Sequence, residues 1–225
     1  MPGLKAAIVP VTPFQQNCTI LYEEESKRGV VVDPGGEVER IAAVVAERGI
    51  EVERILLTHG HIDHAAGAAP LKATLERSLR PLGAPPVRVP IEGPHEADRF
   101  LLDGLEEQGR MFGLPGARSV TPDRWLVEGD TVRIADRDFA VFHCPGHTPG
   151  HVVFFSAELR LLIGGDVLFA GSIGRTDFPY GDHEALLAAI RDKLYPLGDD
   201  VRVLCGHGPS TTIGRERTTN PFVRG

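Results

Sequence analysis

Short apolar runs rich in β-branched residues, each bounded by turn-forming residues, occupy the first part of the chain. The runs at Ala6–Val11, Thr19–Tyr22 and Val30–Asp33 predict strands. The spacing of apolar residues becomes helical over Glu37–Arg48, and Gly49 supplies a suitable helix stop. The chain is therefore expected to open with several strands followed by one helix.

The remainder of the chain mixes strands and helices in the same way. Strands are predicted at Arg54–Leu57, Thr131–Ile134, Asp138–His143, His151–Phe155, Leu161–Ile163 and Val201–Leu204. Helices are predicted from Asp63 onward, over Glu96–Gly109 and over Glu184–Leu194. Pro70 should kink or end the first part of its helix, and Leu82–Pro94 predicts a loop around a short strand, Val87–Val89. Two β-sheets with helices packed outside them would account for this order.

The composition narrows the class of protein. A chain of 225 residues with 42% hydrophobic and 24% charged residues is typical of a globular protein, and we expect residues 1–225 to form one domain. The net charge of -7, without Lys/Arg clusters, disfavours nucleic acid or an anionic membrane as the partner. Neither a membrane-spanning run nor a signal-peptide pattern is visible, and we expect a cytoplasmic protein.

The three cysteines, Cys18, Cys144 and Cys205, are widely spaced and form no CxxC pair. An odd number of isolated cysteines is typical of small buried or near-site residues in a reducing compartment rather than of a disulfide framework. A structural zinc site built from cysteines is therefore disfavoured.

Residues able to bind a metal follow four of the predicted strands. The stretch Thr58–His64, THGHIDH, follows the first of these strands, and His147, Asp166 and His207 follow the other three. Functional side chains are commonly carried by loops at the ends of a sheet scaffold. The pattern therefore predicts one site that is assembled from several loops.

The spacing within THGHIDH suits two cations better than one. His59 and His61 are two residues apart and can reach one cation, whereas Asp63 and His64 are adjacent at a predicted helix start and can point to a second. Imidazole and carboxylate ligands are typical of zinc, iron or manganese. With the three later candidates the set has seven members, which two metals sharing Asp166 would use in full.

The other histidines receive different predictions. His95, His143 and His183 are expected to be structural, hydrogen-bonded residues. His151 lies close to the candidate ligands, and it either orients one of them or has a structural role.

The ordered set T-H-x-H-x-D-H, His147, Asp166 and G-H-G around His207 resembles the metallo-β-lactamase superfamily, over essentially the whole chain. Asp166 at its position resembles the glyoxalase II branch rather than the lactamases that have a cysteine there. Four segments resemble the short bacterial glyoxalase II-like hydrolases that lack a long C-terminal helical domain: Gly93–His95, Thr121–Leu126, Gly171–Pro179 and Asn220–Phe222. The resemblance implies an α/β (α+β) fold, a four-layer αββα sandwich with the site at the sheet edges.

The resemblance also implies the roles of the candidate ligands. It assigns a first metal to His59, His61 and His147, a second metal to Asp63, His64 and His207, and a bridging position to Asp166. The implied activity is hydrolysis of thioesters such as S-lactoylglutathione by a hydroxide that bridges two divalent metals. Zinc is the expected metal, with iron or manganese as alternatives. Asp63 would also hold the attacking oxygen.

The residues that the resemblance implies for substrate recognition differ in part from those of full-length glyoxalase II. The basic residue implied to bind glutathione is present as Arg175, but Asp177 and Pro209 stand where tyrosines are expected. The small-molecule substrate is therefore a glutathione thioester or another thioester. The sequence favours no particular oligomeric state.

Two other functions remain open. Gly174–Phe178 also resembles the persulfide dioxygenases of the same superfamily, which would hold one iron with His59, His147 and Asp166. The fold could also serve as a metal-binding protein without catalysis, although the complete ligand set disfavours this.

Overall fold

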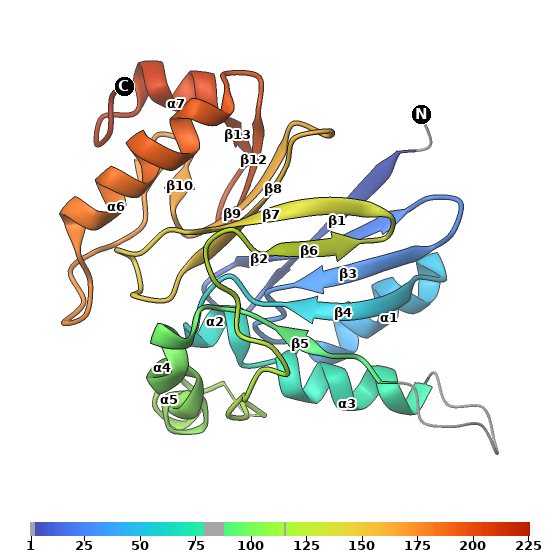
Figure 1. The fold of residues 1–225 in the computed structure, drawn as a ribbon. Coiled ribbons are helices and arrows are strands. Elements are labelled where there is room, and N and C mark those ends of the chain that lie inside the picture. The colour runs from blue at the N-terminus through green and yellow to red at the C-terminus, as the bar shows by residue number, and fades with distance from the viewer. Residues whose placement is uncertain (1–2, 79–87, 115) are drawn as a thin grey trace.

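Two β-sheets pack face to face in the computed structural model, which describes residues 3–78, 88–114 and 116–225 (Figure 1). The first sheet has the order β1-β2-β3-β4-β5, with β1 (Leu4–Val11), β2 (Gln16–Glu23), β3 (Arg28–Val32), β4 (Glu51–Leu56) and β5 (Ile91–Glu92). The second has the order β13-β12-β9-β8-β7-β6, with β6 (Thr131–Ile134), β7 (Arg137–His143), β8 (Val152–Ser156), β9 (Leu161–Gly165), β12 (Arg202–Cys205) and β13 (Thr211–Thr212). A small ribbon pairs β10 (Leu168–Phe169) with β11 (Ser172–Ile173).

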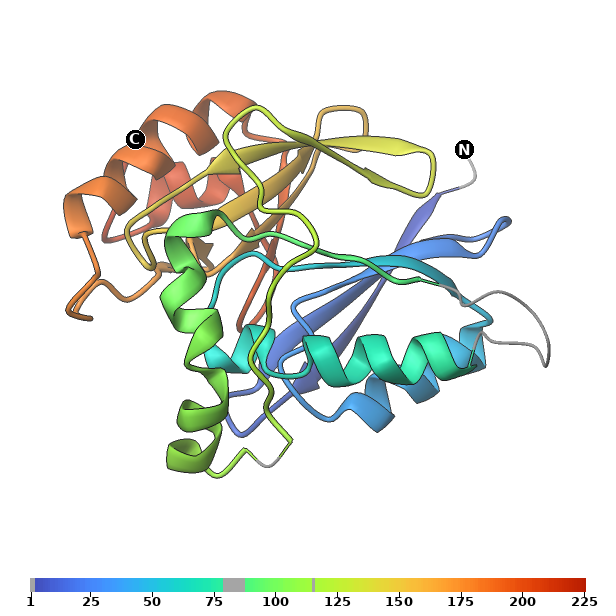
Figure 2. The same cartoon turned by 60° about the horizontal axis from the view of Figure 1, so that its bottom comes forward.

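Helices cover the outer face of each sheet. In Figure 1, α1 and α3 lie against the first sheet, and α6 and α7 lie against the second. The helices are α1 (Val38–Arg48), α2 (Ile62–Ala65), α3 (Ala68–Ser78), α4 (Arg99–Asp103), α5 (Leu105–Phe112), α6 (His183–Ala189) and α7 (Ile213–Thr219). Short 3₁₀ turns occur at Glu96–Asp98 and Tyr195–Leu197, and a π-helical turn at Ile190–Leu194 continues α6. Figure 2 shows α4 and α5 standing across one end of the two sheets.

Three buried apolar clusters separate these layers. Because side chains alternate along a strand, β3 sends Val31 to the cluster under α1 and α3, and Val30 and Val32 to the cluster between the sheets. In β8, Val153 packs toward α6 and α7, whereas Phe154 packs between the sheets. Both faces of each sheet are thus buried, and the predicted four-layer αββα sandwich is confirmed.

The helix predicted from Asp63 onward is divided into α2 and α3. The break falls at Gly67, where a Cβ atom would clash with the carbonyl oxygen of Pro34. Pro70 lies in the first turn of α3, where its missing N–H group leaves no helical hydrogen bond unmade. Pro70 therefore belongs to the first turn of α3 and does not end a helix. Gly67, which precedes it, separates α2 from α3.

Two other predictions differ from the structure. The single helix expected over Glu96–Gly109 is a 3₁₀ turn followed by α4 and α5, which are divided at Gly104. Of the loop predicted at Leu82–Pro94, residues 82–87 lie outside the described ranges. Of the short strand predicted at Val87–Val89, the described residues Arg88 and Val89 are not in a strand, and β5 begins at Ile91.

The three cysteines are buried and free, as the sequence predicts. Within the described ranges, no helix combines the length and the apolar character that crossing a bilayer requires.

Backbone hydrogen bonds join the two sheets at one end of the sandwich. The Thr58 carbonyl accepts from the Val152 N–H at 2.8 Å, and the Gly206 carbonyl accepts from the Asn17 N–H at 2.7 Å. The Gly206 N–H in turn donates to the Gly165 carbonyl at 2.8 Å. These bonds join the end of β4 to the start of β8, and the residue after β12 to β2 and β9. The segments that follow β4, β9 and β12 carry most of the candidate ligands.

Candidate metal centre

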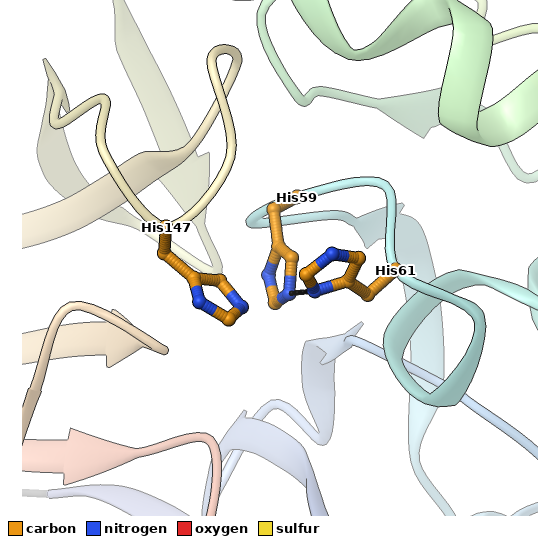
Figure 3. Close-up of side chains that lie close together, drawn as sticks. All are labelled: His59, His61 and His147. Carbon is orange, nitrogen blue, oxygen red and sulfur yellow. Dashed lines mark hydrogen bonds between the residues drawn. The ribbon is translucent and has the colours of Figure 1, made fainter. Parts of the chain in front are cut away.

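Three histidines from two loops point their rings toward one another (Figure 3). His59 and His61 follow β4, and His147 lies between β7 and β8. One ring nitrogen from each residue lies within 4.8 Å of the other two, and His59 Nε2 is 3.1 Å from His61 Nδ1. His59 and His147 are buried. The structure therefore brings together the first predicted ligand group.

A second group lies beside the first. Asp63 and His64 stand at the start of α2, and His207 follows β12. One ligand atom from each lies within 4.8 Å of the others, and His207 Nε2 is 3.2 Å from Asp63 Oδ2. The adjacent pair in THGHIDH and the distant histidine thus lie together, in the grouping that the family resemblance implies.

The Asp166 carboxylate lies between the two groups. Its Oδ1 is 3.3 Å from His64 Nε2, and its Oδ2 is 3.5 Å from both His147 Nε2 and His207 Nε2. One carboxylate therefore reaches members of both groups. We refer to these seven residues, His59, His61, Asp63, His64, His147, Asp166 and His207, as the candidate metal centre.

Two of the histidines have one ring nitrogen fixed by the backbone. His147 Nδ1 donates to the Arg175 carbonyl at 2.8 Å, and His207 Nδ1 donates to the Phe14 carbonyl at 3.1 Å. Each ring therefore turns its Nε2 toward Asp166. Metal-binding histidines are held in this way, with the outer nitrogen donating and the inner nitrogen free to bind.

Asp33 fixes the ring of His64, a role that the sequence reasoning missed. Its Oδ2 is 2.9 Å from His64 Nδ1, and its two oxygens also accept from the Thr58 N–H at 2.7 Å and the Thr58 hydroxyl at 2.6 Å. Asp33, His59 and His64 also lie close enough to form a metal group. We assign Asp33 a positioning role because three donors already use its oxygens. In the sequence, Asp33 is the polar residue at the end of the predicted strand Val30–Asp33, as the metal-ligand candidates are at the ends of theirs. This position is the feature that could have indicated its role.

Asp98 joins the two loops that carry the first histidine group. Its carboxylate accepts from the Gly60 N–H at 2.8 Å, the Gly150 N–H at 2.6 Å and the Thr148 hydroxyl at 2.8 Å. Asp98 is fully buried. Nothing in the local sequence distinguishes it, because its partners lie far away along the chain.

Asn17 holds the loop that carries His207. Its side-chain amide donates to the Cys205 carbonyl at 3.0 Å and to the Gly208 carbonyl at 2.8 Å, on either side of the histidine. With the backbone bond to Gly206, these contacts fix the loop to the start of β2. Asn17 was also not identified from the sequence.

His151 contacts the candidate metal centre without belonging to either ligand group. Its Nε2 accepts from the Asp166 N–H at 3.0 Å, and its ring stacks on His59 with centroids 4.7 Å apart. Gly165, at a φ of 48°, passes so close that a Cβ atom would meet this ring. The contact supports the orienting role for His151.

The three histidines predicted to be structural form hydrogen bonds of their own. His143 Nε2 donates to the Pro149 carbonyl at 2.8 Å, and its ring stacks on His95 with centroids 4.3 Å apart. His183 Nδ1 lies 3.2 Å from the Thr176 hydroxyl. None of the three belongs to a metal group among the described residues.

The first histidine group is held in the neutral form. Burial lowers the pKa of His59 well below its ordinary value, lowers that of His61 to about 3, and lowers that of His147. Neighbouring imidazoles add to the effect for His59 and His61. A neutral imidazole is the form that binds a metal.

The second group and Asp166 combine opposite charges. Burial alone would lower the pKa of His64 and raise that of Asp166, but their mutual attraction reverses both shifts. The pKa of His207 is likewise raised against burial by Asp63, and that of Asp63 is lowered against burial by His64 and His207. Both carboxylates are therefore ionised at neutral pH.

A pocket of about 750 Å³ opens beside these residues. Asp63, Asp166 and His207 line it together with aromatic side chains, and Arg175 stands at its exposed rim. Phe14 and Phe112 meet edge to face with centroids 6.1 Å apart. A small molecule in this pocket would contact the candidate metal centre directly.

The pKa of Asp98 gives a prediction for the metal-free protein. Burial raises this pKa from 3.8 to about 6, although its three hydrogen bonds oppose the shift. Because the folded state then binds this proton more tightly than the unfolded state, the contribution of Asp98 to stability is fully present below about pH 4 and is lost as the pH rises through about 6. One pKa unit corresponds to about 1.4 kcal/mol. Between pH 4 and pH 7 the free energy of unfolding of the wild type should therefore fall by about 3 kcal/mol more than that of Asp98→Asn.

Urea unfolding of chelated protein between pH 4 and pH 7 measures this difference. Wild type and Asp98→Asn are compared at each pH, so that the other titrating groups cancel. Parallel pH profiles for the two proteins would contradict the raised pKa.

Comparisons with known proteins extend over nearly the whole chain. The family model described as the metallo-beta-lactamase superfamily matches residues 11–207. Hydroxyacylglutathione hydrolase GloC from Haemophilus influenzae is 45% identical over 217 residues, which cover 96% of each chain.

Two solved structures share the fold at substantial identity. BLEG-1, described as a B3 metallo-beta-lactamase, is 35% identical with a TM-score of 0.85, covering 98% of this chain and 100% of its own. TTHA1623 in a di-iron-bound form is 37% identical with a TM-score of 0.81, covering 96% of this chain and 100% of its own. The ordered motif, the four-layer fold and these similarities lead to one conclusion: the chain belongs to the metallo-β-lactamase superfamily.

Proposed function

We propose that this protein is a metal-dependent hydrolase of thioesters of the glyoxalase II type, with S-lactoylglutathione as a representative substrate. The observation that carries the proposal is the Asp166 carboxylate, which lies within 3.5 Å of histidines from both ligand groups. The 45% identity to a hydroxyacylglutathione hydrolase supports the choice of reaction. We also propose that residues 1–225 act as one domain, in the cytoplasm.

The side chains fit a pair of divalent cations, of which zinc is the first choice and iron or manganese are alternatives. His147 Nε2 and Asp166 Oδ1 are buried without a hydrogen-bond partner, as is expected of atoms that face a cation. We assign His59, His61 and His147 to the first cation, Asp63, His64 and His207 to the second, and Asp166 to both. Two cations bound there would lower the pKa of a water and so supply hydroxide near neutral pH.

The chain's own residues place the substrate and the attacking oxygen. Asp63 lines the pocket as an ionised carboxylate, and we assign to it the positioning of that oxygen. The aromatic side chains around the pocket exclude other water from the thioester. Arg175 at the rim binds the part of the substrate remote from the thioester.

The cysteines are not suited to act as the nucleophile. All three are buried, and burial raises the pKa of Cys18 well above its ordinary value and those of Cys144 and Cys205 to about 12. Only the thiolate is a good nucleophile. This supports direct attack by an oxygen nucleophile rather than a covalent enzyme intermediate.

One preparation can separate the proposed hydrolase from its alternatives. We expect elemental analysis to find two divalent metals per chain, and the same sample to hydrolyse S-lactoylglutathione. A strong chelator should abolish the activity, and added metal should restore it. One iron per chain with persulfide-dependent oxygen uptake and no thioester hydrolysis would establish the dioxygenase instead. Bound metal without either activity would favour a non-catalytic protein.

A further inference from the structure

A row of stacked side chains leads from the candidate metal centre to the pocket rim. The Tyr180 hydroxyl lies 2.9 Å from His61 Nε2, and the Tyr180 ring stacks on Phe178 with centroids 5.4 Å apart and planes 9° apart. The Arg175 guanidinium lies 4.8 Å from the Phe178 ring centroid. A substrate whose thioester reaches the candidate metal centre would therefore extend its remote part along this wall toward Arg175.

Arg175 is already bound by an acidic neighbour. Its Nε donates to Asp177 Oδ1 at 3.0 Å, and its Nη2 donates to Asp177 Oδ2 at 3.1 Å. This two-bond geometry is the one by which a guanidinium binds a substrate carboxylate. Both side chains are more than two-thirds exposed, at 68% and 69%, so the pair stands open to solvent at the rim. An anionic substrate group must displace Asp177 or lie beside its charge.

The remaining pocket wall is mainly apolar. Among the residues that line the pocket in the described part of the chain, Arg175 is the only lysine or arginine. Phe14, Phe112, Phe169 and Ile173 contribute apolar surface. A glutathione thioester carries two carboxylates. The one cationic side chain described in this wall, Arg175, is already paired with the carboxylate of Asp177.

We propose that Asp177 shifts the substrate preference of the pocket according to the charge of the substrate. By neutralising Arg175 it favours thioesters with a neutral, apolar thiol part over anionic glutathione thioesters. The inference rests on the proposed thioester hydrolysis for its substrate class. Asp177 acts here on specificity through Arg175, and it takes no part in the chemical step.

Removing the charge of Asp177 tests the inference. Asp177→Asn keeps the side-chain size and frees the guanidinium. We expect KM for S-lactoylglutathione to fall, because the freed Arg175 can bind a substrate carboxylate. The fall should be only about threefold, because exposed ion pairs contribute little free energy. KM for the neutral analogue S-lactoyl-N-acetylcysteamine should stay unchanged, as should kcat for both substrates. In an Arg175→Gln background the same change should have no effect on either KM.

The chain offers a matched control in Asp200. This carboxylate forms the same two-bond pair with Arg160, at 2.8 and 2.6 Å. The pair lies at the opposite ends of β9 and β12 from Asp166 and His207. Asp200→Asn therefore removes one negative charge without touching the pocket. The inference is overturned if Asp200→Asn lowers KM equally, or if Asp177→Asn lowers KM for both substrates alike.

A binding measurement keeps the inference separate from the proposed function. S-methylglutathione is a thioether that lacks the reacting bond, and its affinity can be measured by calorimetry on the metal-loaded protein. Tighter binding to Asp177→Asn than to wild type supports the inference even if no thioester is hydrolysed, a result that would contradict only the proposed function. Equal binding, or binding to neither protein, overturns the inference.

Discussion

Asp166→Ala should abolish thioester hydrolysis and metal retention together. The buried carboxylate lies between His64, His147 and His207, and its removal takes away the negative charge that both proposed cations share. Loss of about 4 kcal/mol of transition-state stabilisation corresponds to roughly a 1000-fold fall in kcat, and we expect at least this. Steady-state kinetics and elemental analysis on the same preparation measure the two effects.

Asp200→Ala provides the comparison for this variant. It removes an aspartate from the far end of the same strand pair, and it should retain both activity and metal. Circular dichroism should confirm that both variants are folded. If Asp166→Ala kept its metals and its activity, the bridging role of Asp166 would be wrong.

Asp33→Ala should weaken the second proposed metal position and the fold at the same time. The change leaves two buried donors, His64 Nδ1 and the Thr58 N–H, without their acceptor, whereas the Thr58 hydroxyl still has His59 Nδ1 at 3.0 Å. Each unsatisfied donor costs about 1–3 kcal/mol, so the free energy of unfolding of the metal-free protein should fall by about 2 kcal/mol or more. Because His64 loses its orientation, affinity for one metal equivalent should fall about 10- to 100-fold.

Competition with a chromophoric chelator can resolve the two metal equivalents of this variant. Asp33→Asn keeps one acceptor oxygen and should show a smaller loss of both stability and affinity. Unchanged binding of both equivalents by Asp33→Ala would show that Asp33 does not support a metal ligand.

Much of the fold was predictable because the strands are short apolar runs rich in β-branched residues, bounded by turn-forming residues, and because helices such as α1 have apolar residues at helical spacing. Strands such as β3 and β8 place alternate residues in two different cores, and α1 carries one apolar face. The positions at which helices break were less predictable. Gly67 and Gly104 divide two predicted helices, and the break at Gly67 depends on a close approach by Pro34, which no local pattern encodes.

The sequence by itself determined the chemistry of the candidate metal centre. Ligand-type residues at four strand ends, with the spacing of THGHIDH, select histidine and carboxylate ligands whatever the detailed packing. It also placed these residues directly after strands, because the short apolar runs before them, rich in β-branched residues, predict strands.

Only the tertiary structure decided how these ligands are held. Asp98 lies 38 residues from Gly60 and 52 residues from Gly150, and Asn17 lies 188 residues from Cys205. A lone buried Asp or Asn carries no periodic signal, since its role is set by which donors and acceptors the fold brings to it. Likewise, Arg175 is visible in the sequence as a cation, but its pairing with Asp177 at the end of an aromatic stack exists only in the folded pocket.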